Sequence, residues 1–173
     1  DTMEREAFAA RQSMRVEDWA DPGAFASFEG RKPEWSGVVG LEGIPTSDNR
    51  LILPKALTWR ELPITLQDQL KSQDGHDGAV PVGPITNIYR VDREDGGISV
   101  MGDGMFDSGQ EGQDARRRMS EGTKQGVSMD LTEVELDLPE DPEAAMEVLM
   151  GGGQLRIMRA RIGAATLVTI PAF

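Results

Sequence analysis

The stretch that decides the fold lies at residues 126–138 and reads GVSMDLTEVELDL. Apolar side chains occupy every second position, which is the period of a strand with one buried face. This alternation runs through Val127, Met129 and Leu131 and resumes at Val134, Leu136 and Leu138. The change of phase near Thr132 predicts a β-bulge within the strand.

Similar β-prone runs lie on both sides of this stretch. The segments that the pattern predicts to be strands are 37–44, 50–53, 62–66, 79–91, 97–106, 155–161 and 164–170. A Gly-containing turn at 92–96 predicts a hairpin. Helices are predicted for residues 1–19, for 109–123 and for a short stretch within 139–153. Because strands and helices do not alternate, the order indicates a β-rich α+β fold, a barrel or sandwich with peripheral helices.

Two segments differ in character. Residues 1–36 are expected to form an N-terminal helix and an aromatic arm, in which Phe25, Phe28 and Trp35 anchor the arm to the body or to a partner subunit. Residues 37–173 are expected to form one β domain. Since the chain begins at Asp1 without a Met and stops directly after an apolar run, we expect a piece of a longer polypeptide.

The composition excludes several kinds of chemistry. With one His and no Cys, the chain has no disulfide, no Cys nucleophile, no thiolate metal site and no two-His metal site. The acidic cluster Asp103, Asp107, Glu111 and Asp114 lacks the EF-hand spacing. We therefore expect neither a metal nor a cofactor. A net charge of −12 opposes nucleic-acid binding, and no run approaches the ~18 apolar residues of a membrane helix, so a soluble protein is expected.

What remains is carboxylate chemistry or a hydroxyl nucleophile served by His76. Ser128 lies within the strand at 126–138 and shares a face with Asp130, because residues two apart on a strand point the same way. His76 lies in a Gly- and Asp-rich loop, DGHDG at 74–78. A neutral imidazole, whose ordinary pKa is ~6.5, can take a serine proton at neutral pH. The alternative is that neither residue is catalytic, Ser128 being a surface serine of a strand and His76 an exposed histidine of a loop.

These segments, taken in order, carry a resemblance. They are TSDNRLILP at 46–54, LTWRELP at 57–63, GHDGAVPVGPI at 75–85, GVSMDL at 126–131 and AATLVTIPAF at 164–173. Over most of residues 37–173 the chain resembles the prohead (capsid maturation) serine proteases of tailed bacteriophages, which are related to herpesvirus assemblin. The resemblance implies a closed or partly closed antiparallel β-barrel with peripheral helices, as in the herpesvirus proteases.

The resemblance also implies an activity. It is that of a serine endopeptidase which cleaves scaffold, or the scaffolding segment of the capsid protein, and in some cases itself, during prohead maturation. By the same carry-over Ser128 is the nucleophile and His76 the general base. Asp77 matches the acid of the family's His-Asp pair, and its rivals for the third position are Asp130 and an acid or polar group on the last strands. The herpesvirus relatives use a second His there, which this chain does not have.

Further expectations depend on the same resemblance. The major capsid protein or the scaffold would be the substrate, and the enzyme would act as a homodimer or assembly inside the immature prohead, within the host cytoplasm. It would bind no nucleic acid and no membrane. Arg156, Arg159 and Arg161 would either support an oxyanion site or form surface charge pairs. Two other classes stay open: a non-catalytic capsid- or scaffold-binding domain of a virion, and a hydrolase that uses carboxylates alone.

Overall fold

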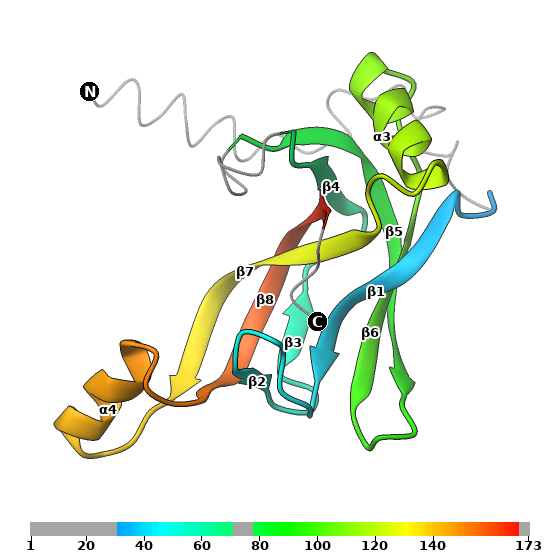
Figure 1. The fold of residues 1–173 in the computed structure, drawn as a ribbon. Helices are drawn as coiled ribbons and strands as arrows, with labels where there is room; N and C mark the ends of the chain where they lie inside the picture. The colour runs from blue at the N-terminus through cyan, green and yellow to red at the C-terminus, as the bar shows by residue number, and fades with distance from the viewer. Residues whose placement is uncertain (1–30, 71–77, 170–173) are drawn as a thin grey trace, which may run out of the picture. The chain divides into compact units, whose positions relative to one another are not determined.

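The computed structural model describes residues 31–70 and 78–169 (Figure 1). The chain divides into two compact units, residues 1–32 and 33–173, and the second unit holds every described helix and strand. The helix predicted at 1–19 and the aromatic residues Phe25 and Phe28 lie outside the described residues.

An eight-stranded sheet forms the body of the second unit and curls into a half-barrel (Figure 1). Its strands are β1 (Trp35–Glu42), β2 (Arg50–Ile52), β3 (Leu57–Trp59), β4 (Ile64–Asp68), β5 (Val80–Asp92), β6 (Ile98–Gly104), β7 (Gly126–Asp137) and β8 (Leu155–Val168). The strand order is β1-β6-β5-β4-β8-β2, and β3 and β7 also pair with β8. Two helices, α3 (Gln110–Ser120) and α4 (Pro142–Leu149), accompany the sheet. The prediction of a β-rich fold with helices outside the sheet is confirmed.

The half-barrel is compatible with the expected β-barrel, but the sheet is mixed, so the expectation that its strands are antiparallel is wrong for three of the pairings. Strand β7 runs antiparallel to β8, whereas β2, β3 and β4 all run parallel to it. These three short strands act as one interrupted strand along β8, with Pro54 and Pro63 in the two breaks. Proline has no N–H to donate to a ladder, so it interrupts pairing there. Each link carries the chain onward to the next stretch of β8, so all three strands run in one direction.

Strand β8 is a single element, although the pattern predicts two strands with a break near Gly163. It is paired along both edges, by β2, β3 and β4 on one side and by β7 on the other. This pairing keeps the backbone extended through Gly163 and overrides the low strand preference of glycine. The predicted bulge in β7 is confirmed, because the register with β8 shifts between Thr132 and Glu135, and Glu133 has a φ of 51°.

The core lies on the inner face of the curled sheet. Its fully buried side chains come from most strands and include Val39, Leu57, Leu66, Val82, Val100, Ile162 and Leu167. Trp35, expected in the aromatic arm, instead begins β1 and is buried in this core, 5% exposed. The domain body therefore includes residues that the pattern assigned to the arm.

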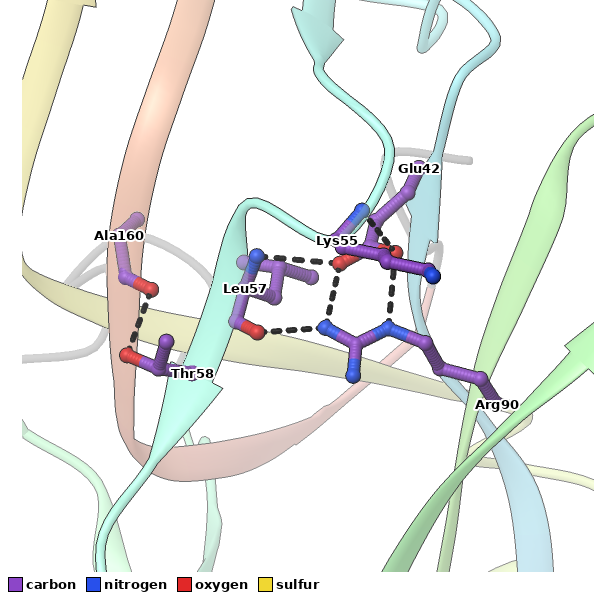
Figure 2. Close-up of polar contacts among 6 residues, drawn as sticks. All are labelled: Glu42, Lys55, Leu57, Thr58, Arg90 and Ala160. Carbon is purple, nitrogen blue, oxygen red and sulfur yellow. Dashed lines mark hydrogen bonds and ion pairs between the residues drawn. The ribbon is translucent and has the colours of Figure 1, made fainter.

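A buried carboxylate joins three parts of the sheet (Figure 2). Glu42, 0% exposed at the end of β1, accepts hydrogen bonds from the backbone N–H groups of Lys55 and Leu57, both at 3.0 Å. Arg90 of β5 donates to the same carboxylate from Nε at 3.0 Å and from Nη2 at 2.9 Å. The Arg90 guanidinium also lies 5.0 Å from the centre of the Trp59 ring. Because every oxygen of Glu42 has a partner, the charge can remain buried.

The two helices differ in how they are held. Helix α3 buries Gly112 and Ala115 against the body, whereas α4 has no buried residue. Helix α4 lies at the far end of the β7–β8 hairpin (Figure 1). Its N-terminus is capped by Asp141, whose side chain accepts a hydrogen bond from the N–H of Ala144 at 3.0 Å.

Candidate functional site

Ser128 lies near the start of β7, on the face of the strand opposite to the core. Val127 before it is buried in the core, and Met129 after it packs against β1, so close that a Cβ on Gly40 would lie 2.8 Å from the Met129 sulfur. These two neighbours fix the strand, and the alternation of side chains turns the half-buried Ser128 to the other face.

A threonine that the sequence pattern did not single out lies directly across from Ser128. Thr166 of β8 is its register partner and is 0% exposed. The Thr166 hydroxyl donates a 2.8 Å hydrogen bond to Oδ2 of Asp130. Ser128, Asp130 and Thr166 therefore share one face of the β7–β8 pair, as the strand period predicts for the first two. The signal that was available for Thr166 is its place as a polar residue within an apolar closing strand.

The row continues across the sheet to β4. Gln67 is the register partner of Thr166 on its other side, so Gln67, Thr166 and Ser128 lie side by side on three adjacent strands. With strands about 4.8 Å apart, the Cα atoms of Gln67 and Ser128 are separated by about 10 Å. The end of β4 is thus two strands away from Ser128.

His76 and Asp77 lie outside the described residues, within the segment 71–77. Along the chain this segment follows β4, which ends at Asp68, and precedes β5, which begins at Val80. The structure therefore brings together Ser128 and Asp130, and the pairing of Ser128 with His76 stays a prediction.

An open groove of about 690 Å³ borders Ser128. One wall comes from the connection into β2 and from β2 itself, and the other wall and floor come from β7 and β8. The lining residues are Thr46, Asp48, Arg50, Ile52, Ser128, Met129, Asp130, Leu131, Val134, Leu136, Leu155 and Ile157. The groove is polar beside Ser128 and Asp130 and again beside Leu155, where Thr46, Asp48 and Arg50 line it, and its other lining residues are aliphatic.

The late arginines form charge pairs across the hairpin. Arg156 contacts Asp137 at 3.0 Å and Arg161 contacts Glu133 at 3.3 Å, while Arg159 lies opposite Glu135 in the register. At about 3.3 Å per residue, Arg161 lies about 17 Å along β8 from Thr166, and the other two lie farther. These contacts match the surface-pairing interpretation rather than an oxyanion role.

A second buried carboxylate ties the end of β4 to the start of β7. Asp68 is 0% exposed and accepts a 2.8 Å hydrogen bond from Nη1 of Arg118 on α3. Nζ of Lys124 lies 2.8 Å from its other oxygen, in an ion pair without hydrogen-bond alignment, and also donates to the carbonyl of Gln69. Lys124 lies two residues before β7 begins. The cluster therefore fixes the entry of the strand that carries Ser128.

No family model matches the chain, and comparisons with curated proteins and with solved structures found no significant match. Within residues 31–70 and 78–169, no group of three or more His, Asp or Glu side chains is arranged to hold a metal ion. In the same part of the chain, no helix combines the length and the apolar character needed to cross a membrane.

Proposed function

We propose that the chain is a serine endopeptidase of the prohead-protease type, with Ser128 as nucleophile and His76 as general base. The observation that supports this most is the position of Ser128: it lies half-buried on a strand paired along its length, at the border of an open groove, with the Thr166–Asp130 pair beside it. A nucleophile on a rigid element loses little freedom when it attacks, which favours catalysis.

The mechanism assigns each group a step. The Oγ of Ser128 forms a bond to the scissile carbonyl carbon while His76 takes the hydroxyl proton, and backbone N–H groups stabilise the oxyanion. His76 then gives the proton to the leaving amine as the C–N bond breaks. Water, deprotonated by His76, hydrolyses the acyl-enzyme and restores Ser128. Asp77 holds the imidazole in its tautomer, with Asp130 as the rival for that role.

The substrate and setting follow from the same proposal. The enzyme hydrolyses scaffold, or the scaffolding segment of the major capsid protein, and its own chain, inside the immature phage prohead in the host cytoplasm. It acts as a homodimer or as part of the capsid-interior assembly, without nucleic acid, membrane or cofactor. The half-barrel is then one part of a herpesvirus-protease-like barrel.

A serine-directed fluorophosphonate tests the nucleophile. The wild-type chain should be labelled at Ser128, and Ser128→Ala and His76→Ala should each abolish both labelling and cleavage of a co-expressed capsid or scaffold protein. Ser36→Ala is the matched control, because Ser36 is also a strand serine beside a carboxylate and donates to Asp103 at 2.6 Å. Processing by Ser128→Ala would overturn the nucleophile assignment.

A second function has one observation in its favour. A non-catalytic domain that binds capsid or scaffold subunits would need an exposed docking face, and α4 exposes apolar side chains. The same labelling distinguishes the two: absence of label on the wild-type chain assembled with its substrate favours the binding domain.

A further inference from the structure

Helix α4 exposes apolar side chains that the body of the protein does not use. Met146, Leu149 and Met150 are 59%, 52% and 81% exposed. Their spacing of three and four residues places them on one face of the helix and its last turn. We call these three residues the α4 apolar surface. Apolar side chains that are exposed side by side on a helix indicate an interaction site.

The helix is held in place without this surface. Asp141 caps its N-terminus, and Val148 faces the glycine turn that follows, since a Cβ on Gly153 would lie 3.2 Å from Val148 Cγ2. The Gly152 N–H also donates to the carbonyl of Glu147 at 2.8 Å. These local contacts fold α4 onto its own connection and leave the α4 apolar surface free for another molecule.

The charge around this surface has one sign. From Gly126 to Leu155 the chain has no Lys, Arg or His, and its acidic residues are Asp130, Glu133, Glu135, Asp137, Glu140, Asp141, Glu143 and Glu147. Those nearer the sheet include Glu133 and Asp137, which are paired with arginines of β8. Among the described residues, Glu143 and Glu147 on α4 form no ion pair. The apolar surface is therefore bordered by uncompensated negative charge.

We propose that α4 is a docking site for an amphipathic segment of another protein that carries Lys or Arg beside aliphatic side chains. The basic groups would complement Glu143 and Glu147, and the aliphatic groups would pack on Met146, Leu149 and Met150. Methionine side chains adapt to differently shaped partners, which suits such a surface. This site does not depend on the proposed protease activity, because the hairpin separates it from Ser128.

Charge also decides against two other occupants. A symmetric contact between the α4 helices of two copies would bring one acidic α4 against another, which like-charge repulsion opposes. Residues 1–19 of this chain carry five acidic and three basic side chains, so their net charge has the same sign as α4. A basic partner is the occupant that the surface fits.

Methionine methyl NMR on the full chain tests the proposal. The probe is a short helical peptide of leucine and lysine, and the control peptide replaces every lysine by glutamate. We expect saturable shifts of the Met146 and Met150 methyl signals with the lysine peptide alone. The Met129 methyl, packed between β7 and β1, should not shift. Equal binding of the glutamate peptide, or shifts spread over all methionines, would overturn the proposal, as would shifts that depend on protein concentration without peptide.

Variants locate the binding. Met146→Ser combined with Leu149→Ser and Met150→Ser should weaken the lysine peptide about tenfold or more, and Glu143→Gln with Glu147→Gln about threefold, with a weaker dependence on salt. The control is Tyr89→Ser with Val91→Ser, which removes exposed apolar side chains of β5. All changed side chains on α4 are exposed, so circular dichroism should show intact folding. If the β5 control weakens binding as much as the α4 variant does, α4 is not the site.

Discussion

Thr166 and Asp130 are joined by a 2.8 Å hydrogen bond that crosses from β8 to β7 beside Ser128. The donor is fully buried and the acceptor is half-buried, so the bond fixes the carboxylate on the face that Ser128 shares. This places a held carboxylate next to the proposed nucleophile.

Thr166→Val should test that relationship. The substitution keeps the shape and removes the donor, so it should cost about 1 kcal/mol of unfolding free energy and lower the fluorophosphonate labelling rate of Ser128 about tenfold. Thr166→Ser restores the hydroxyl and should recover most of the labelling rate. Loss of stability with an unchanged labelling rate would show that the bond serves the fold alone.

The third member of the catalytic group is decided by comparing Asp77→Asn with Asp130→Asn. Replacing the carboxylate that orients His76 should lower the cleavage rate by several orders of magnitude, because the wrong imidazole tautomer is then favoured. The other should cost tenfold or less. Single-turnover cleavage of a co-expressed scaffold segment measures both rates. Equal small losses would remove both acids from the mechanism.

The buried Glu42–Arg90 pair should contribute more to the free energy of unfolding than an exposed ion pair does. Glu42→Ala leaves the partly buried Arg90 guanidinium and two backbone N–H groups without their acceptor, so we expect a loss of about 3–5 kcal/mol in urea denaturation. The control is Arg50→Ala, which breaks the ion pair between Arg50 and Asp48. These two side chains are 56% and 40% exposed, so the substitution should cost less than about 1 kcal/mol. Similar losses in the two variants would contradict a special role for burial.

Asp68→Asn should destabilise the protein and loosen the first residues of β7. The change leaves the Arg118 and Lys124 cations without their buried counter-charge, and we expect a loss of about 3 kcal/mol. Hydrogen exchange should increase at Gly126 and Val127, where β7 begins. The control is Glu121→Gln at the C-terminal end of α3, which breaks the exposed ion pair between Glu121 and Arg117. It should change the free energy of unfolding by less than about 0.5 kcal/mol. Unchanged protection of β7 in Asp68→Asn would refute the link.

The β5–β6 turn should respond to acid. Hydrogen bonds from the Arg93 side chain, and then from the Gly97 N–H, lower the pKa of Asp95 below its ordinary value of 3.8. Because the folded pKa is the lower one, this carboxylate stabilises the folded state fully above pH 3.8 and loses that contribution as pH falls through the folded pKa. Asp95→Asn should therefore flatten part of the acid-unfolding curve below pH 3.8. Asp92→Asn, at the end of β5 beside the turn, is the control, and an equal effect there would contradict the assignment.

Local patterns in the sequence predict where strands lie better than they predict which strands pair with one another. The alternation at 126–138 predicts β7 and its bulge because both arise from neighbouring residues. Nothing local shows that β2, β3 and β4 line up beside β8, since those pairings join residues such as Arg50 and Leu155 from opposite ends of the domain. The direction of the strands, and hence the mixed sheet, follows from these distant pairings.

The candidate site divides in the same way. The period of a strand is enough to place Ser128 and Asp130 on one face. In the sequence Thr166 stands out only as a polar residue within an apolar strand, because its place beside Ser128 depends on which strand lies next to β7 and in which register. The buried acids Glu42 and Asp68 give no local signal either, since their cationic partners Arg90 and Arg118 are each about fifty residues away in sequence.

The two-sided pairing of β8 has a consequence for how the protein is made. Strands β2, β3, β4 and β7 all precede β8 along the chain; β4 also pairs with β5, whereas β2, β3 and β7 pair with β8 alone among the described strands. During synthesis these strands leave the ribosome before the strand that joins them exists, so the sheet can close only after residue 168 has emerged. Folding is then governed by long-range closure and should be slow, and the unpaired strands must be kept from associating with other chains until β8 arrives.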